Sequence, residues 1–280
     1  MNILIIDRDT LSIQLVKSKL EVMGHKITEE PVKNNALDRL EKEEYDIIFF
    51  DPAPLNNARP IVLGIRRSVS NYPYVILMSQ DMNQEEAIRS GANEIISKPL
   101  DAGKIDGIIE NADRMTSLIK RIGDEGEDFP SAGGVIAKSA FNQLFLSAID
   151  RADRYGERSF LVFIGIKNYN EILSMDGPQA AAYSAAKLSQ YLVRLRRQSD
   201  IIAQTGKSEY CLMLQRPQYD TEPMEAANRF AEALGQLEDI TNSEIAQVEV
   251  HVTLLEVPVG TRHIEHTISY DKQGAKRVSV

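Results

Sequence analysis

The chain is poor in cysteine, in long apolar runs and in positive charge, and each shortage excludes a class of protein. Its one cysteine, Cys211, lies in the apolar run YCLML, so we expect a buried thiol and a reducing cytoplasm rather than a disulfide framework. No apolar run approaches the length of a membrane span. The net charge of −9 argues against nucleic acid, which binds to clustered Lys and Arg. We therefore expect a cytoplasmic protein with neither nucleic acid nor membrane as a partner.

The first hundred residues alternate short apolar runs with helical patterns. The apolar runs lie at 3–6, 47–50, 74–78 and 94–97. Such alternation predicts a parallel sheet that is covered by helices on both faces. Polar residues at the carboxyl ends of the strands form the site in sheets of this kind. Here those residues are Asp7, Asp51, Ser79 and Lys98.

Three of these positions resemble the receiver domain of two-component response regulators. Asp51 matches its phosphorylated Asp, Ser79 its hydroxyl residue, and Lys98-Pro99 its Lys-Pro pair. The likeness covers residues 1–122 and implies a flavodoxin-like (βα)5 fold. It also implies that Asp51 accepts phosphate while Asp7 and Asp51 hold Mg²⁺.

The receiver family carries a second acid after its first strand, where this chain has Arg8. Because Mg²⁺ prefers carboxylate oxygens in octahedral geometry, a guanidinium at this position removes a ligand and adds a positive charge. We expect Arg8 to pair with Asp7 or Asp51 instead. Asp9 is either a cap of the first helix or a replacement ligand. Phosphorylation of Asp51 and a receiver domain fixed in one state both remain open.

One long helix is predicted from Pro99 to about residue 122. Its apolar positions follow a heptad spacing at Ile105, Ile108, Ala112, Met115, Ile119 and Ile122. We expect the first half to pack on the receiver sheet. The half past Ala112 is a candidate for homodimer contact or for docking on the second domain. The glycine, acid and proline of residues 123–134 indicate a linker, and residues 135–280 then form the second domain.

The second domain resembles the GGDEF domain of diguanylate cyclases. The resemblance rests on Ala152, Arg154 and Tyr155 before an apolar strand, on the segment RQSDIIAQTGKSEY that starts at Arg197, and on GAKRV near the end of the chain. It implies an α+β fold of the nucleotide-cyclase type. With the receiver domain, the predicted class is α/β followed by α+β.

The residues that carry catalysis in that family are replaced here. Gly165 stands where the family has its metal-binding Asp, and Lys167 stands where it has the partner of that Asp. Ser208 replaces the acid of the GGDEF signature, and Leu173 replaces the Asn that reads guanine. A two-metal site needs carboxylates to activate a hydroxyl and to stabilise phosphoryl charge. The resemblance therefore implies a protein without cyclase activity.

The RxxD motif upstream of the signature is intact in this chain. Arg197 and Asp200 form it, and Arg229 follows on the next helix. In the family these residues form an inhibitory site for cyclic di-GMP, where Arg grips phosphate and Asp accepts from guanine. The resemblance implies a non-catalytic cyclic di-GMP receptor that relays binding to a protein partner. The alternatives are a protein-interaction scaffold without nucleotide binding and, last, a diguanylate cyclase of low rate.

Overall fold

The computed structural model describes residues 1–55, 57–69, 71–129, 133–237, 239–241, 247–271 and 274–278. The chain divides into two compact units. The first unit is Met1–Arg121 with Ser147–Glu157 and Pro258–Gly260, and the second unit is Ile122–Leu146 with Arg158–Val257 and Thr261–Val280. The expected linker at 123–134 includes residues 130–132, which lie outside the described residues. The domain boundaries at 122 and 135 stay predictions.

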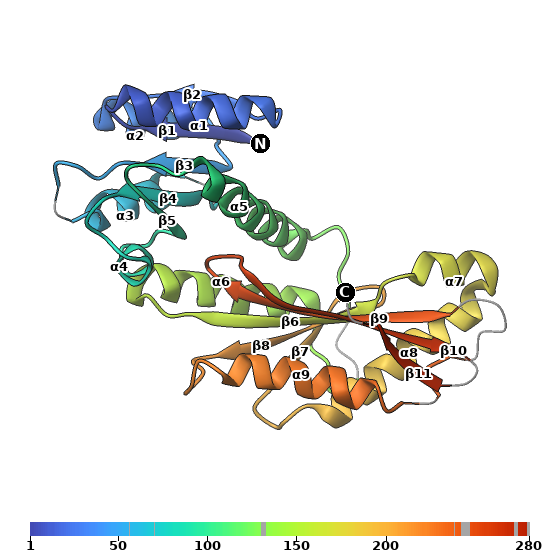
Figure 1. Cartoon of the computed structure of the whole chain (residues 1–280). Coiled ribbons are helices and arrows are strands. Elements are labelled where there is room, and N and C mark those ends of the chain that lie inside the picture. The colour runs from blue at the N-terminus through green and yellow to red at the C-terminus, as the bar shows by residue number, and fades with distance from the viewer. Residues whose placement is uncertain are drawn as a thin grey trace. The chain divides into compact units, whose positions relative to one another are not determined.

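Five parallel strands form the sheet of the first unit, in the order β2-β1-β3-β4-β5 (Figure 1). The strands are β1 (Asn2–Ile6), β2 (Lys26–Glu29), β3 (Ile47–Phe50), β4 (Tyr74–Ser79) and β5 (Glu94–Ser97). The helices are α1 (Thr10–Val22), α2 (Lys33–Leu40), α3 (Arg59–Ser68), α4 (Gln84–Arg89) and α5 (Ala102–Gly123). This order is that of the flavodoxin-like doubly wound fold, so the predicted receiver fold is confirmed.

Strand β3, in the middle of this sheet, is apolar along its whole length. All four residues of β3 are 0% exposed. Because successive side chains of a strand point to opposite faces, both faces of the sheet are covered there. The edge strand β2 is half exposed instead, with the sequence KITE. Every parallel strand ends at the same edge of the sheet, which places Asp7, Asp51, Ser79 and Lys98 near one another.

Helix α5 buries most of its apolar seam, past Ala112 as well as before it. Ile105 and Ala112 are fully buried, Met115 and Ile122 are 1% and 2% exposed, and Ile119 is half-buried. Met115 lies beside Gly260, where an added Cβ would approach the Asn111 carbonyl oxygen to 2.5 Å. A side chain at position 260 would therefore push this turn away from the helix. The homodimer contact expected along residues 105–122 stays a prediction.

Six strands form the antiparallel sheet of the second unit, in the order β11-β10-β9-β6-β8-β7. The strands are β6 (Ser159–Ile166), β7 (Ile201–Gly206), β8 (Glu209–Gln215), β9 (Val248–Val257), β10 (Arg262–Asp271) and β11 (Gly274–Val278). The remaining helices are α6 (Lys138–Tyr155), α7 (Tyr169–Met175), α8 (Gly177–Leu195) and α9 (Glu222–Leu234). The predicted α+β class of this half of the chain is confirmed.

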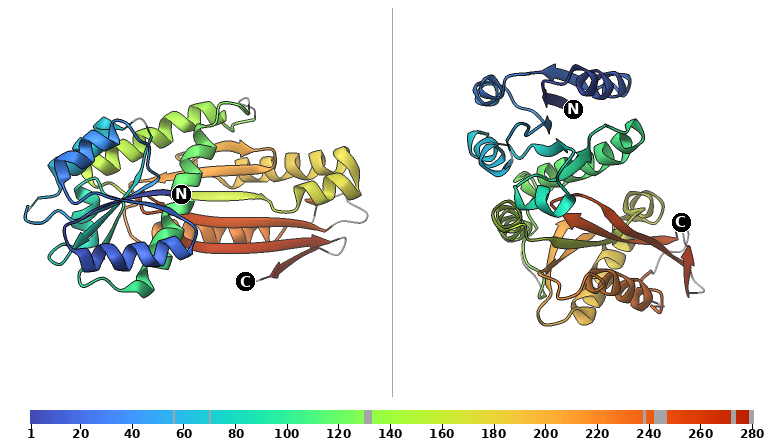
Figure 2. Two further views of the ribbon diagram at one scale, coloured as in Figure 1. Left: turned by 90° about the horizontal axis from the view of Figure 1, so that it is seen from above. Right: turned by 60° about the vertical axis from the view of Figure 1, so that its left-hand side comes forward.

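One face of this sheet packs on α8 and α9, which Figure 2 shows beside it. Val162 and Ile164 of β6 belong to the same core as Leu188 of α8 and Phe230 of α9. Cys211 of β8 is fully buried, as predicted. Among the described residues, no helix combines the length and the apolar character that a bilayer crossing requires.

Candidate functional site

A hollow of about 570 Å³ in the second unit brings together the three residues predicted to bind the dinucleotide. Arg197 follows α8, Asp200 precedes β7, and Arg229 lies on α9. All three line this hollow, so two adjacent chain segments and one distant helix meet there. The sequence motif therefore corresponds to one place on the surface of the second unit.

The chain between Arg197 and Asp200 forms a closed turn. The Arg197 amide donates to Asp200 Oδ2 at 2.8 Å, and the Asp200 amide donates to the Arg197 carbonyl at 3.1 Å. Arg196 Nη1 donates to the Asp200 carbonyl at 3.2 Å. The Asp200 side chain is 8% exposed. The turn thus fixes a buried carboxylate and leaves the exposed Arg197 side chain to extend from a rigid base.

The guanidinium of Arg229 has donors to spare. Its Nη2 lies 3.7 Å from Asp200 Oδ2, which is an ion pair too long for a hydrogen bond. Its Nε is buried, and none of the described residues accepts a hydrogen bond from it. A buried donor without a partner costs roughly 1–3 kcal/mol.

This arrangement suits a ligand that carries both phosphate and hydrogen-bond donors. Guanidinium groups bind phosphate through parallel hydrogen bonds and stack on flat bases. An ionised carboxylate only accepts hydrogen bonds, so Asp200 selects a group with N–H donors. The hollow therefore combines the two chemistries that a guanine nucleotide presents.

The sheet position that corresponds to a catalytic acid is tightly packed. Gly165 of β6 pairs with Glu209 of β8 and with His251 of β9. An added Cβ at Gly165 would lie 2.9 Å from His251 Cε1 and 3.0 Å from the Ser208 carbonyl oxygen. The space for a side chain at this position is therefore taken by His251 of the adjacent strand and by the turn between β7 and β8.

The side chains around Gly165 bond to each other. Glu209 Oε1 accepts from Thr205 Oγ1 at 2.7 Å, and Glu209 Oε2 lies 3.9 Å from His251 Nε2. Ser208 Oγ points to the Ile166 carbonyl at 3.4 Å. Within the described ranges, no three His, Cys, Asp or Glu side chains are grouped as a metal site. Lys167 is exposed, and Leu173 on α7 is 40% exposed.

In the first unit, the polar residues at the strand ends meet at Lys98. Lys98 Nζ donates to Asp7 Oδ2 at 2.7 Å and also to Asp51 Oδ2. Burial opposes the charge of Lys98, but its hydrogen bonds to Asp51 and Asp7 outweigh this and raise its pKa. Ser79 Oγ accepts from the Asp81 amide at 3.3 Å. Lys98 thus joins Asp7 and Asp51 directly, and Ser79 lies at the end of β4, the strand beside β3 and β5.

Arg8 does not take the partner that its position suggested. Its side chain is exposed, and no ion pair joins it to Asp7 or Asp51 within the described part of the chain. Lys98 occupies both carboxylates instead. Asp9 caps α1, which is the first of its two expected roles, since its Oδ1 accepts from the Leu11 amide at 3.1 Å. The expected pairing of Arg8 is therefore wrong, because the chain directs this side chain to solvent.

A Mg²⁺ ion at this edge would find Asp7 and Asp51 as carboxylate ligands. Both accept hydrogen bonds from Lys98, so a cation would compete with an ammonium for the same oxygens. Asp9 is occupied, because its Oδ2 accepts from Ser12 Oγ at 2.6 Å. Asp7 and Asp51 thus provide two carboxylates for a cation, whereas the receiver family provides three.

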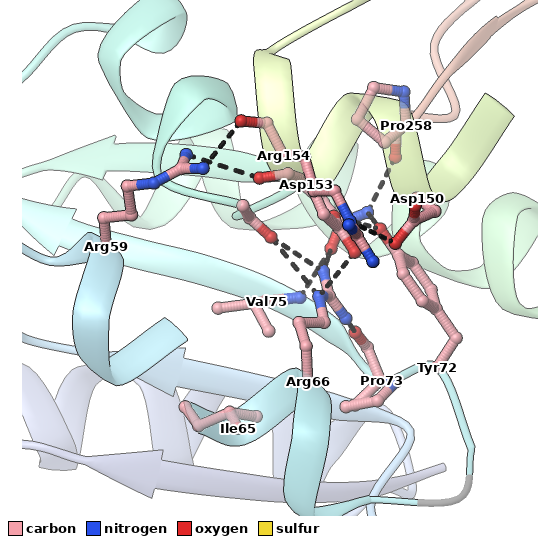
Figure 3. A network of polar contacts seen from close by, with 12 residues as sticks. Arg59, Ile65, Arg66, Tyr72, Pro73, Val75, Asp150, Asp153, Arg154 and Pro258 are labelled. Carbon is pink, nitrogen blue, oxygen red and sulfur yellow. Dashed lines mark hydrogen bonds and ion pairs between the residues drawn. The ribbon is translucent and has the colours of Figure 1, made fainter. Parts of the chain in front are cut away.

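A network of buried polar side chains in the first unit was not predicted from the sequence (Figure 3). Arg66 Nε on α3 lies 3.5 Å from Asp153 Oδ2 on α6, and these side chains are 7% and 11% exposed. Tyr72 donates to Asp153 Oδ1 at 3.0 Å, and the Arg66 guanidinium lies 3.8 Å from the centre of the Tyr72 ring. Burial raises the pKa of Asp153 despite the charge of Arg66. Arg66 and Asp153 therefore form a buried ion pair, and the Tyr72 ring packs against the guanidinium.

Further hydrogen bonds tie two distant segments into this unit. Asn93 Nδ2 donates to the Pro258 carbonyl at 2.8 Å, and the Tyr74 hydroxyl donates to the Val259 carbonyl at 2.6 Å. Arg59 Nη2 donates to the Arg154 carbonyl at 2.6 Å, at the end of α6. A cation at a helix C-terminus also interacts favourably with the helix dipole. These bonds explain why residues 147–157 and 258–260 belong to the first unit.

Comparison with known proteins finds similar proteins for both halves of the chain. Residues 131–273, just over half of the chain, match the family model described as "Diguanylate cyclase, GGDEF domain". Among solved structures, a two-component response regulator from Clostridium difficile is 23% identical and covers 41% of this chain and 96% of its own, with a TM-score of 0.37. A GGDEF domain from Pseudomonas aeruginosa is 18% identical and covers 43% of this chain and 70% of its own, with a TM-score of 0.35. No curated protein matches the chain.

Proposed function

Because the chain belongs to the family of GGDEF diguanylate cyclase domains, we propose that it is a non-catalytic receptor for cyclic di-GMP. The GGDEF family match supports a role in cyclic di-GMP signalling, and the flavodoxin-like sheet of the first unit is compatible with a receiver domain of a two-component system. The observation that carries the proposal is the hollow lined by Arg197, Asp200 and Arg229. It supplies two guanidinium groups and a buried carboxylate in one place, together with a donor that lacks a partner. These groups match the phosphates and the guanine edges of the dinucleotide.

The absence of catalysis is supported by the packing around Gly165. Position 165 has no room for a carboxylate, and the neighbouring signature position is Ser208. Without these two acids, cations have no anchor at the place where the family activates a ribose hydroxyl. The low-rate cyclase is therefore the weakest alternative. The scaffold alternative differs from the receptor by predicting no response to nucleotide at all.

Substituting Gly165→Asp is expected to disturb the sheet without restoring a cyclase. The new side chain meets His251 and the backbone at Ser208, so the free energy of unfolding should fall by about 1–3 kcal/mol, as overpacking does. Chemical denaturation and a GTP-turnover assay with Mg²⁺ or Mn²⁺ measure both effects. Gly107→Asp is the matched control, because an added Cβ there meets nothing within 4 Å. Product formed by an undamaged Gly165→Asp protein would contradict this account.

We propose that phosphate is not the main input to the receiver domain. Lys98 pairs with both Asp7 and Asp51, and Arg8 stands where the second acid of the family would be. The domain then serves as a fixed partner of the nucleotide-binding half. A change in assembly or in domain arrangement on ligand binding is the output that a protein partner would read. A homodimer through residues 105–122 is one form of that assembly.

Substituting Arg8→Asp is expected to make Asp51 a better phosphoacceptor. The added carboxylate supplies a ligand and removes a positive charge, so we expect Mg²⁺ to bind about tenfold more tightly. Incubation with acetyl phosphate and Mg²⁺, followed by intact-mass measurement, shows the fraction modified. Asp51→Asn in the same background identifies the modified residue. Equal and complete modification of the natural protein would refute the proposal that phosphate input is lost.

A thermal-shift titration tests the receptor directly. A ligand that binds only the folded state stabilises it by about 2.7 kcal/mol at 100 times its dissociation constant. We expect cyclic di-GMP to raise the melting temperature by about 5–10 °C at that excess. Cyclic di-AMP carries the same phosphates but different base edges, and it should produce a much smaller shift. An unchanged melting temperature with both nucleotides would favour the scaffold alternative.

A further inference from the structure

An exposed aromatic side chain stands at the hollow of the second unit. Tyr219 lines the hollow together with Arg197, Asp200 and Arg229. It lies in the loop between β8 and α9, and 66% of it is exposed. An aromatic ring in water forgoes the favourable burial of a large apolar surface. A bound ligand with a flat apolar face would recover that burial.

Two other tyrosines of this unit lie in its core instead. Tyr210 and Tyr270 are 4% and 1% exposed. Their hydroxyls donate to the carbonyls of Ala185 at 3.4 Å and of Leu234 at 2.7 Å. The Tyr219 hydroxyl has no hydrogen-bond partner among the described residues. Its ring and hydroxyl therefore contribute little to the fold of the unbound protein.

The backbone that carries Tyr219 is nonetheless fixed. Glu222 Oε2 accepts from the Gln218 amide at 2.9 Å, and the Glu222 amide donates to the Tyr219 carbonyl at 3.1 Å. These two bonds enclose Tyr219 and attach its loop to the first turn of α9. A ring held on an ordered backbone loses little conformational freedom when a ligand stacks on it.

The charges around the hollow favour a base over a bare phosphate. Arg197 and Arg229 are cationic, whereas Asp200, Glu222 and Glu225 are acidic. A polyanion alone would meet more negative than positive side chains. A guanine base offers N–H donors to carboxylates and a flat face to an aromatic ring.

We propose that Tyr219 is the stacking platform for a guanine base of cyclic di-GMP in this hollow. The proposal rests on the proposed receptor function and adds a residue that the RxxD motif does not contain. Phosphates would bind at the guanidinium groups, and one base would lie on the Tyr219 ring. The residue then contributes to selection of a purine dinucleotide over simple phosphates.

Calorimetric titration of cyclic di-GMP into single variants tests this role. Tyr219→Ala should weaken binding about tenfold, because base–aromatic stacking contributes on the order of one decade or more in affinity. Tyr219→Phe keeps the ring and should bind within about twofold of the natural protein, since the hydroxyl is not needed for stacking. Tyr155→Ala is the matched control, because Tyr155 is also 66% exposed but does not line the hollow.

A fluorescent variant provides a second readout that does not depend on affinity. The chain has no tryptophan, so Tyr219→Trp introduces a single indole at the hollow. Stacking of guanine on this indole should quench its emission on saturation with cyclic di-GMP, whereas the emission of Tyr155→Trp should stay constant.

The outcomes separate the two proposals. Failure of the natural protein to bind would overturn the receptor and the platform together. Binding that is lost in Arg197→Ala but unchanged in Tyr219→Ala, with no quenching in Tyr219→Trp, would overturn the platform and leave the receptor intact.

Discussion

Replacing Arg197 by alanine is expected to weaken cyclic di-GMP binding by about 100-fold, since losing one side of a charged hydrogen-bonded contact costs roughly 2–5 kcal/mol. The Arg197 side chain lines the hollow, is exposed and makes no ion pair with a described residue, so a ligand is its natural partner. The turn itself should persist, because its bonds use the Arg197 backbone and the Asp200 carboxylate. Equilibrium binding measures the loss of affinity, and the melting temperature of the unliganded variant shows whether its fold is intact.

Arg194→Ala is the matched control for this substitution. Arg194 lies on the last turn of α8, is exposed, and is not among the residues that line the hollow. It should leave affinity within about twofold, because distant surface charge is screened by salt. Arg197→Lys keeps the charge but loses the planar fork, so we expect intermediate affinity. Equal weakening by Arg194→Ala and Arg197→Ala would point to general electrostatics rather than to a site.

Replacing Asp153 by alanine is expected to lower the free energy of unfolding of the first unit by about 3–5 kcal/mol. Removal of the carboxylate leaves Arg66 buried without its counter-charge, and Tyr72 loses its acceptor. A desolvated charge without its counter-charge is more costly than a missing surface pair. Chemical denaturation, followed by a probe of the first unit, measures the loss.

Asp150→Ala is the control on the same helix. Asp150 pairs with Arg154 at 2.9 Å, but these side chains are 57% and 61% exposed. Water screens such a pair, so its loss should cost less than about 1 kcal/mol. If Asp153→Ala and Asp150→Ala destabilise equally, the network does not hold the segment 147–157 in the first unit.

The alternation of apolar runs was sufficient to predict four of the five parallel strands. The strand order then placed the polar residues that follow those runs at one edge, where Lys98 joins Asp7 and Asp51. The edge strand β2 was not located in the sequence, because KITE is exposed at both ends and has no continuous apolar run. Strand prediction from hydrophobicity works best where both faces of a sheet are buried.

Other features depend on three-dimensional packing that a sequence pattern does not encode. Arg66 and Asp153 are far apart in the chain and of types that usually lie in solvent, so nothing marked them as a buried pair. The lack of room for a side chain at position 165 arises from His251 on a neighbouring strand. Tyr219 was unremarkable in sequence, and its place at the hollow follows from the loop before α9. In contrast, Arg197, Asp200 and Arg229 were identified through motif spacing and are brought together by the structure.

Calorimetric titration of cyclic di-GMP into the natural protein tests the central claim most directly. We expect saturable binding that neither GTP nor cyclic di-AMP reduces at equal concentration. We also expect no conversion of GTP to product during long incubation. Folded protein at tens of micromolar that gives no heat beyond dilution would contradict the assignment of this chain as a cyclic di-GMP receptor.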